Sequence, residues 1–373
     1  MKYLSVCSGI EAASVAWHPL DWEPLAFSEI EPFPRKVLAH HYPGVPCHGD
    51  FTTLKDEPWI KDADLLVGGT PCQAFSVAGL RQSLNDDRGN LTLEFVRLAN
   101  AIDAFRPTPS VIIWENVPGV LSVKDNAFGC FLAALVGNDT PLVPTGGKWT
   151  NAGMVIGPQR SAAWRVLDAQ YFGVAQRRRR VFVVASARDG FDPAEVLFER
   201  EGVRRDTAPR REAREDTTCF TTNSIGGYGE GIGTLRANGG DLGGGSESLV
   251  FSNAVGSLTA RGVNSFNAAD VDAGHYLPVA FHPTQDPISS TDGSTHALGC
   301  GLSGGQASVA VATNMAVRRL TPRECERLQG FPDDYTAIPG AADGPRYKAL
   351  GNSMAVPVMR WIGQRIQNHI DLR

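Results

Sequence analysis

Cys72 is a residue whose type and setting suggest chemistry. It stands in the turn Gly68-Gly69-Thr70-Pro71-Cys72-Gln73, directly after an apolar run at residues 65–67. A cysteine in a turn that opens a helix gains thiolate character from the helix dipole and from nearby hydrogen-bond donors. We therefore interpret Cys72 as a nucleophile. The alternative, a small buried hydrophobic side chain, fits less well with a turn at the end of a strand.

A carboxylate and a run of arginines follow two further apolar runs. Glu115 is flanked by Trp114, Val117 and Pro118, so burial would raise its pKa and let it deliver a proton near neutral pH; a helix cap is the alternative. Four arginines occupy positions 177–180. Alternation along an extended chain sends Arg178 and Arg180 to one face and their neighbours to the other. We interpret one of these two pairs as entering a site and the other pair as binding phosphate. The alternatives are a solvated basic edge of the sheet or a localisation signal.

The elements that must position these residues read as alternating strands and helices. Apolar or β-branched runs lie at residues 3–7, 25–28, 65–67, 111–114 and 181–185, and each suits a buried parallel strand. Apolar residues recur at helical spacing from Leu91 to Phe105, and Arg106-Pro107 ends that pattern. The sequence therefore predicts an α/β fold with a doubly wound, mostly parallel sheet, whose ligands bind at the carboxyl ends of the strands.

Residues after the first strands suggest an adenosine-containing ligand. Gly9 lies in a turn after the first strand, and Glu29 follows the second strand 20 residues later, where a carboxylate commonly binds ribose hydroxyls. Asp50 and Phe51 could hold the amino group and the face of an adenine. Neither Gly-x-Gly-x-x-Gly nor a Walker sequence occurs, so we expect no pyrophosphate or triphosphate.

The cysteines form no recognisable framework. The seven are odd in number, scattered from Cys7 to Cys325, and include no Cys-x-x-Cys pair. This pattern is typical of neither a disulfide-stapled fold nor a zinc site, so we expect no bound metal.

Charge and glycine are unevenly distributed. The chain of 373 residues has a net charge of −5, which by itself argues against a polyanionic partner. Residues 151–188 carry a net charge of +6, however, and residues 316–373 one of +3; such local fields can attract phosphate. Between Gly226 and Gly305 lie 18 of the 40 glycines, which predicts loops, short strands and a domain boundary. No run approaches a membrane span and no secretory signal precedes the first strand, so we expect a soluble, cytoplasmic protein with no membrane partner.

Six blocks of the sequence, taken in order, resemble the cytosine carbon-5 DNA methyltransferases, which use S-adenosylmethionine. The resemblance covers about residues 1–188 and 316–373. The blocks are the first glycine turn, Pro71-Cys72-Gln73, Glu115-Asn116-Val117, the Gln-x-Arg-x-Arg of Gln176, Arg178 and Arg180, Leu320-Thr321-Pro322-Arg323-Glu324-Cys325 with Gln329-Gly330-Phe331-Pro332, and Tyr347-Lys348-Ala349-Leu350-Gly351-Asn352-Ser353.

The resemblance implies a role for each proposed catalytic residue. Cys72 would add to carbon 6 of a target cytosine, Glu115 would supply a proton at ring nitrogen 3, and Arg178 would bind the cytosine carbonyl. Arg180 and Gln73 would support this site. The family flips its target base out of the duplex, and residues 74–90 resemble the mobile loop that closes behind the base. No residue is identified as the base that removes the carbon-5 proton.

The resemblance also implies two sets of binding residues. The cofactor-binding positions are Cys7, Gly9, Ile10, Glu11, Glu29, Ile30, Asp50, Phe51, Pro71, Leu91, Asn352 and Ser353. The DNA-binding positions are Ser76, Arg81, Arg88, Gln176, Thr234, Leu235, Arg236, Gly239 and Arg261. Arg236 and Arg261 are candidates to read guanine, although a loop arginine can equally bind phosphate.

The chain departs from the family pattern at the cofactor turn. Cys7 and the pair Glu11-Ala12 stand where the family has Phe and a glycine pair, and Ile30 stands where an aromatic residue often stacks on adenine. We therefore expect cofactor binding to be retained but weakened.

The expected organisation is a catalytic domain of residues 1–188 with 340–373, and a target-recognition domain of residues 189–339. We expect a complete, monomeric bacterial or phage enzyme that acts on double-stranded DNA, in some cases beside a cognate restriction endonuclease. Two alternatives stay open. One is a tRNA cytosine-5 methyltransferase of the same fold, suggested by Cys219-Phe220-Thr221. The other is a non-catalytic DNA-binding regulator, against which Cys72, Glu115 and Arg178 argue.

Overall fold

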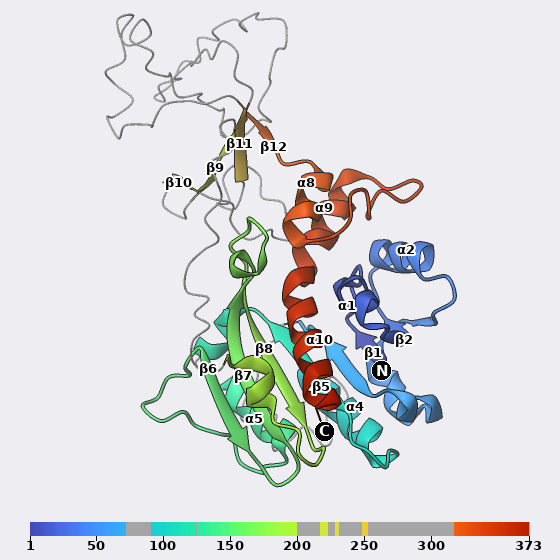
Figure 1. The fold of residues 1–373 in the computed structure, drawn as a ribbon, viewed down its shortest axis with the longest axis vertical. Coiled ribbons are helices and arrows are strands. Elements are labelled where there is room, and N and C mark those ends of the chain that lie inside the picture. Colours follow the sequence, from blue (N-terminus) through green and yellow to red (C-terminus); the bar gives the residue numbers. More distant parts are fainter. Residues whose placement is uncertain are drawn as a thin grey trace, which may run out of the picture. The chain divides into compact units, whose positions relative to one another are not determined.

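The computed structural model describes residues 1–71, 91–123, 125–199, 217–222, 228–230, 248–252 and 317–372 (Figure 1). The chain divides into two compact units. One comprises Met1–Pro209 with Pro322–Arg373, and the other comprises Arg210–Thr321. Residues 189–209 and 322–339 therefore join the larger unit, although we expected them in the smaller domain. The catalytic and recognition roles of the two units stay predictions.

An eight-stranded sheet forms the centre of the larger unit, in the order β3-β2-β1-β4-β5-β8-β7-β6. The pairs from β3 to β5 are parallel, and the pairs from β5 to β6 are antiparallel. The strands are β1 (Lys2–Val6), β2 (Glu23–Ser28), β3 (Cys47–His48), β4 (Leu65–Gly68), β5 (Val111–Asn116), β6 (Ala152–Ile156), β7 (Ser161–Asp168) and β8 (Arg179–Ser186). The predicted α/β class with a mostly parallel sheet is confirmed.

The direction of β8 differs from our prediction of five parallel strands. The run at residues 181–185 is a buried strand, as expected, but it pairs antiparallel with β5. The reason is the connectivity: β6, β7 and β8 follow one another through connections too short to hold a crossover helix, so they must alternate in direction.

Helices pack against the sheet and against one another. α1 contacts α10, α10 also contacts α6, α4 contacts α5, and α9 contacts both α2 and α8. Their bounds are α1 (Ala12–Trp17), α2 (Pro32–His41), α4 (Leu91–Ala104), α5 (Ala127–Val136), α6 (Pro193–Leu197), α8 (Pro322–Gln329), α9 (Asp343–Asn352) and α10 (Val356–Asp371). α4 ends just before Phe105, which is 61% exposed, so the predicted helical pattern stops one residue early.

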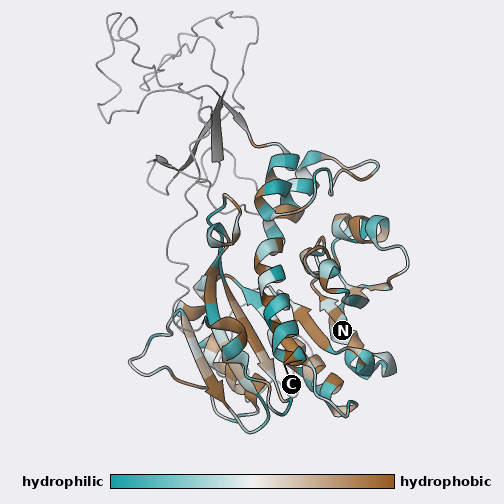
Figure 2. Cartoon of the chain, in the orientation of Figure 1, coloured by the Kyte–Doolittle hydropathy of each residue, from teal (hydrophilic) through white to brown (hydrophobic). Residues whose placement is uncertain are grey.

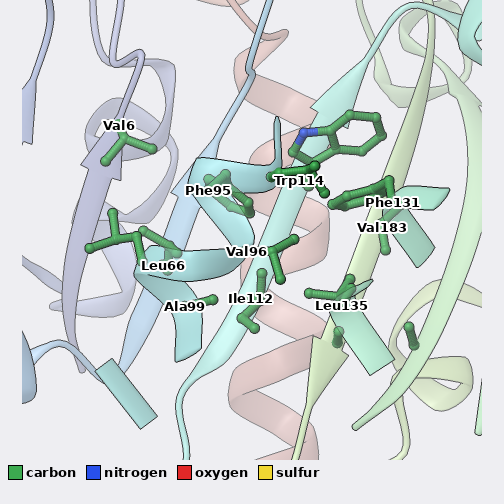
Figure 3. Packing of buried hydrophobic residues seen from close by; sticks show 14 of the residues in the cluster. Val6, Leu66, Phe95, Val96, Ala99, Ile112, Trp114, Phe131, Leu135 and Val183 are labelled. Atoms are coloured by element: carbon green, nitrogen blue, oxygen red, sulfur yellow. The ribbon is translucent and has the colours of Figure 1, made fainter. Parts of the chain in front are cut away.

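A large hydrophobic core lies between the sheet and the helices α4 and α5. Figure 3 shows Phe95 and Val96 of α4 and Phe131 of α5 directed toward Ile112 and Trp114 of β5. Figure 2 shows hydrophobic residues concentrated along the strands of the sheet. Burial of this apolar surface fixes the strand ends, on which the candidate site is built.

The C-terminal helix α10 packs back on the larger unit, as expected. The indole Nε1 of Trp17 in α1 donates a hydrogen bond to the Met359 carbonyl at 2.8 Å. Gly363 permits this close approach, because a Cβ atom there would lie 2.4 Å from the same Nε1. Both ends of the chain therefore build one unit.

We predict that Gly363→Ala lowers the free energy of unfolding by about 1–3 kcal/mol, because the added methyl group overpacks the contact with Trp17. Denaturant unfolding measures this. Gly344→Ala is the matched control, since a Cβ at Gly344 in α9 meets nothing within 4 Å. Equal stability of the two variants would contradict the packing argument.

The smaller unit contains a four-stranded antiparallel sheet in the order β10-β9-β11-β12. Its strands are β9 (Thr217–Thr222), β10 (Tyr228–Glu230), β11 (Ser248–Ser252) and β12 (Val317–Arg319). Within the described parts of both units, no helix has the length and apolar character needed to cross a membrane.

Candidate active site

The turn after β1 has an unusual backbone and meets the end of β2. Cys7, Gly9 and Glu11 have φ values of 50°, 57° and 63°, a region that favours glycine. The Gly9 amide donates to Oε2 of Glu29 at 2.7 Å. The structure thus brings together Gly9 and Glu29, which we predicted from the sequence to bind the same cofactor.

Other predicted cofactor residues lie at the neighbouring strand ends. Ile30 is 71% exposed beside Glu29, whereas Phe51 is buried. Asp50 caps a short 3₁₀ helix, Phe51–Asp56, by accepting from the Thr52 amide at 2.9 Å. Leu91 begins α4 and packs against the core.

Arg35 on α2 holds this edge together, and sequence reasoning missed it. Its guanidinium donates to the carbonyls of Glu29 and His48, both at 2.8 Å. It thereby joins the ends of β2 and β3. Nothing in the local sequence distinguishes Arg35 from a solvated helical arginine.

The end of β4 is fixed by side chains from β5 and α4. Asn116 donates to the Thr70 carbonyl at 2.9 Å, and the Thr70 hydroxyl lies 2.8 Å from that of Thr92 and accepts from the Trp114 indole at 2.9 Å. These bonds set the backbone immediately before Pro71. Cys72 and Gln73 follow directly in the chain but lie outside the described residues.

Glu115 is a buried carboxylate at the end of β5, 7% exposed. Its Oε1 atom lies 3.1 Å from Nε of Arg180 in an ion pair, yet it accepts no well-directed hydrogen bond from the described residues. Burial raises the pKa of Glu115, while Arg180 and Arg178 lower it. Glu115 can therefore hold a proton, and the ion pair with Arg180 leaves Oε2 as the oxygen for a ligand.

Gly69 leaves room for this carboxylate. A Cβ atom at Gly69 would lie 2.9 Å from Oε2 of Glu115 and 3.3 Å from Cε of Met354. Gly69 was not among the predicted site residues, although it stands in the turn that contains Cys72.

Burial alternates along the arginine run, as predicted. Gln176 and Arg178 are buried, Arg180 is half-buried, and Arg177 and Arg179 are exposed. Arg178 donates from Nη2 to the carbonyls of Gly351 and Ser353 at 3.1 and 2.5 Å. Burial lowers the pKa of Arg178, and nearby Glu115 opposes that shift.

Gln176 is fully buried, and neither polar atom of its side-chain amide has a hydrogen-bond partner among the residues that the structure describes. It therefore presents no surface to DNA in this structure, and its predicted DNA contact stays a prediction.

A small cavity, ≈ 40 Å³, joins the cofactor turn to Glu115. Its walls come from the ends of β1, β4 and β5 and from the segment after α9. The lining residues are Ser5, Val6, Cys7, Ser8, Gly9, Glu11, Ala12, Ala13, Val67, Gly69, Glu115, Asn352, Ser353 and Met354. Five predicted cofactor residues and one predicted catalytic residue thus share one cavity, while Ser5, Ser8, Gly69 and Met354 were missed.

Of the other predicted residues, Ile10 is buried and Pro71 is exposed, and neither lines this cavity. The rest lie outside the described part of the chain. These are the catalytic Cys72 and Gln73, and the DNA-binding Ser76, Arg81, Arg88, Thr234, Leu235, Arg236, Gly239 and Arg261.

A larger cavity, ≈ 420 Å³, lies beside β7 and α10 and contains none of the predicted site residues. Its walls combine the arginines Arg165 and Arg179 with the acids Asp168 and Glu199, around Trp361. It lacks a nucleophile, so we place the chemistry at the smaller cavity. Among the described residues, no group of three or more His, Cys, Asp or Glu side chains could hold a metal ion.

The sequence matches the family model of the C-5 cytosine-specific DNA methylases over residues 1–140 and 251–368. Two similar curated proteins are type II methyltransferases. M2.BsuMI of Bacillus subtilis is 25% identical over 98% of this chain and 75% of its own length. M.HpaII of Haemophilus parainfluenzae is 25% identical over 98% of this chain and 88% of its own length.

A further similar protein, from Escherichia phage P1, is named a DNA N-6-adenine-methyltransferase. It is 44% identical over 98% of this chain, and the chain spans 61% of its length.

Solved methyltransferase structures share the fold. The Dnmt2 methyltransferase of S. pombe aligns with a TM-score of 0.55 at 14% identity, covering 99% of this chain and 98% of its own. The Entamoeba histolytica methyltransferase EhMeth aligns with the same TM-score and identity, covering 100% and 99%.

Proposed function

Because the chain belongs to the C-5 cytosine-specific DNA methylase family, we propose that it methylates carbon 5 of cytosine in duplex DNA through Cys72, Glu115 and Arg178. The observation that carries the proposal is the meeting of Glu115, Arg178 and the turn before Cys72 at one edge of the sheet. Each comes from a different strand end, as expected for a site on a doubly wound sheet.

The chemistry requires a nucleophile and an acid that act on the same ring. Carbon 5 of cytosine is a poor nucleophile, so a bond from the Cys72 sulfur to carbon 6 first pushes electrons toward carbon 5 and ring nitrogen 3. Glu115 supplies a proton at nitrogen 3, and Arg178 stabilises the cytosine carbonyl. After methylation the carbon-5 proton is lost, the bond to sulfur breaks to regenerate the Cys72 thiolate, and ring nitrogen 3 returns its proton to Glu115.

The surroundings of Glu115 suit this role. Its pKa is raised mainly by burial, which favours the protonated acid over the ionised form compared with a carboxylic acid in water. The ion pair with Arg180 fixes the carboxyl group against the end of β5. Arg180 engages Oε1, so Oε2, which lies beside Gly69, is the oxygen that can face the base.

The family is dependent on S-adenosylmethionine, and the residues present fit this cofactor. When bound it supplies an electrophilic methyl group. We propose that Glu29 holds the ribose, Asp50 and Phe51 the adenine, and Asn352 with Ser353 the amino-acid end. The cavity supports this, because Asn352 and Ser353 line it together with Gly9, whose amide donates to the Glu29 carboxylate.

Binding of double-stranded DNA is proposed from the family and from the charge of the chain. Arg177 and Arg179 are exposed next to the buried Arg178, where they could meet phosphate. We assign base reading to the smaller unit, residues 210–321, which includes Arg236 and Arg261. The type II names of the relatives support a role beside a restriction endonuclease, and we propose a monomer that acts in the bacterial or phage-infected cytoplasm.

Methylation of adenine is a second candidate, favoured by the name of the phage P1 relative. The amino group of adenine carries its own lone pair and needs no thiolate addition to the ring. The combination of Pro71-Cys72-Gln73 with Glu115 therefore favours cytosine. Incubation with unmethylated plasmid DNA or tRNA, followed by mass spectrometry of the nucleosides, separates these reactions.

We predict that this experiment yields 5-methylcytosine in DNA. The Cys72→Ser variant is the negative control and should yield none. N6-methyladenine alone, or 5-methylcytosine only in tRNA, would overturn the proposal. Binding of DNA without any methylated product would favour the non-catalytic regulator. Bisulfite sequencing of the same plasmid then identifies the recognised sequence.

A further inference from the structure

Glu11 is a buried carboxylate in the wall of the small cavity. It is 1% exposed, and its φ of 63° is a conformation in which a side chain is disfavoured. The resembled family has glycine at this position, so the turn itself needs no side chain there. A carboxylate kept at a strained position of a binding turn points to a role for the carboxylate.

Three hydrogen-bond donors hold the Glu11 carboxylate. The Ser5 hydroxyl donates to Oε1, and both the amide and the hydroxyl of Ser14 donate to Oε2, at 3.0 and 2.5 Å. Tyr3 supports the network, with its hydroxyl 2.6 Å from that of Ser14. A carboxylate offers about four acceptor positions, so about one stays available to a ligand.

Glu11 has no cationic partner among the described residues. The titratable groups that face it are Tyr3 of β1, Tyr42 after α2, Cys47 of β3 and Tyr335 after α8. Burial raises the pKa of all four, that of Tyr42 to about 12, so each is neutral near pH 7.

The cations across the cavity are engaged elsewhere. Arg180 is paired with Glu115, and Arg178 donates to the carbonyls of Gly351 and Ser353 at the end of α9. Burial raises the pKa of Glu11, and its hydrogen bonds to Ser14 and Ser5 lower it. The described residues therefore place no free cation beside Glu11, and a ligand cation would stabilise its ionised form.

We propose that Glu11 binds the α-ammonium group at the amino-acid end of the cofactor and so selects ligands that carry this charge. The inference rests on the proposed function and deepens it. The cavity is of a size for an amino-acid end, and Glu29 and Asp50 stand at the neighbouring strand ends for the adenosine.

The proposal predicts how the affinity for the ligand changes with pH. A ligand cation stabilises ionised Glu11, so binding releases a proton between the pKa of the complex and the higher pKa of the free protein. The affinity should therefore rise with pH until the free protein has lost that proton.

The test is isothermal titration calorimetry with three ligands. S-adenosylmethionine and S-adenosylhomocysteine both carry the ammonium group, whereas 5′-methylthioadenosine keeps the adenosine and lacks the amino-acid end. We expect Glu11→Gln to weaken the first two roughly 10- to 100-fold, as for loss of a buried charged hydrogen bond, and to leave 5′-methylthioadenosine unchanged. Glu29→Gln is the matched carboxylate control, and it should weaken all three.

Distinct outcomes overturn the proposal. Equal weakening of all three ligands by Glu11→Gln would show a structural role only, and weakening of S-adenosylmethionine alone would assign Glu11 to the sulfonium. Glu11→Gly relieves the backbone strain, so tighter binding of S-adenosylhomocysteine by this variant would also contradict charge recognition. If the wild-type chain binds none of the three, the proposed function itself fails.

Proton release gives an independent measurement. Titration of wild-type protein with S-adenosylhomocysteine in two buffers of different ionisation enthalpy should show protons released, and Glu11→Gln should abolish that release. Unchanged release in the variant would assign it to another group and overturn the inference.

Discussion

Replacement of Cys72 by serine is expected to abolish methyl transfer to DNA. A serine hydroxyl is hardly ionised near neutral pH and is a far weaker nucleophile than a thiolate, so addition to carbon 6 fails. Loss of a nucleophile that acts with its partners as a unit lowers the rate by about 10⁴-fold or more. The initial rate of tritium transfer from labelled S-adenosylmethionine to unmethylated plasmid measures it.

DNA binding separates loss of chemistry from loss of the fold. Serine has nearly the size of cysteine, so Cys72→Ser should bind plasmid DNA as the wild type does in a mobility-shift assay. Cys130→Ala is the matched control, because Cys130 is buried in α5 and does not line the cavity. It should lose some stability but no activity per folded molecule.

A covalent adduct provides a second readout. Fluorine at carbon 5 cannot leave as a proton does, so DNA that contains 5-fluorocytosine should trap the wild-type enzyme through sulfur at carbon 6. Cys72→Ser should form no adduct. Residual activity of this variant within tenfold of wild type, or an adduct that survives the substitution, would refute the assigned nucleophile.

The sequence predicted the sheet edge because local patterns are enough to find buried strands. Glu115 and Glu29 each follow an apolar run, and the carboxyl ends of parallel strands share one edge, so their proximity could be expected. The alternation of Arg178 with Arg179 followed from the period of an extended chain in the same way.

Other features depend on contacts between distant residues and have no local pattern. Asn116 donates to the carbonyl of Thr70, which lies 46 residues away in the sequence. Arg178 donates to the carbonyl of Gly351, which lies 173 residues away. The antiparallel direction of β8 depends on the short connections that link it to β7 and β6. An apolar run looks alike in either direction, which is why that prediction was wrong.

Glycines show the same limit. Gly9 was found because it follows a strand, as a turn glycine should. Gly69 also stands in a turn that the sequence shows. Its importance is that a Cβ atom at this position would lie only 2.9 Å from Oε2 of Glu115 and crowd the carboxylate. Only the packed structure shows which glycine makes room for a carboxylate.

Replacement of Glu115 by glutamine is expected to lower kcat by roughly 10²- to 10⁴-fold, the usual contribution of a positioned general acid. Glutamine can still donate a hydrogen bond to ring nitrogen 3 but cannot transfer a proton to it. Binding of DNA and of S-adenosylhomocysteine should change little. Rapid-quench single turnovers, which report on chemistry rather than product release, measure the effect.

The pH dependence of single turnovers tests the role more sharply than the rate alone. Burial raises the pKa of Glu115, and catalysis needs the protonated form, so the rate should fall as pH rises through that pKa. In Glu115→Gln this alkaline limb should disappear, because the variant has no proton to lose there. Glu326→Gln is the matched control, since Glu326 is also buried but accepts hydrogen bonds from Thr336 and Arg346; it should keep both the rate and the limb. An alkaline limb that persists in Glu115→Gln would assign the titration to another group and remove Glu115 as the acid, even if the rate had fallen.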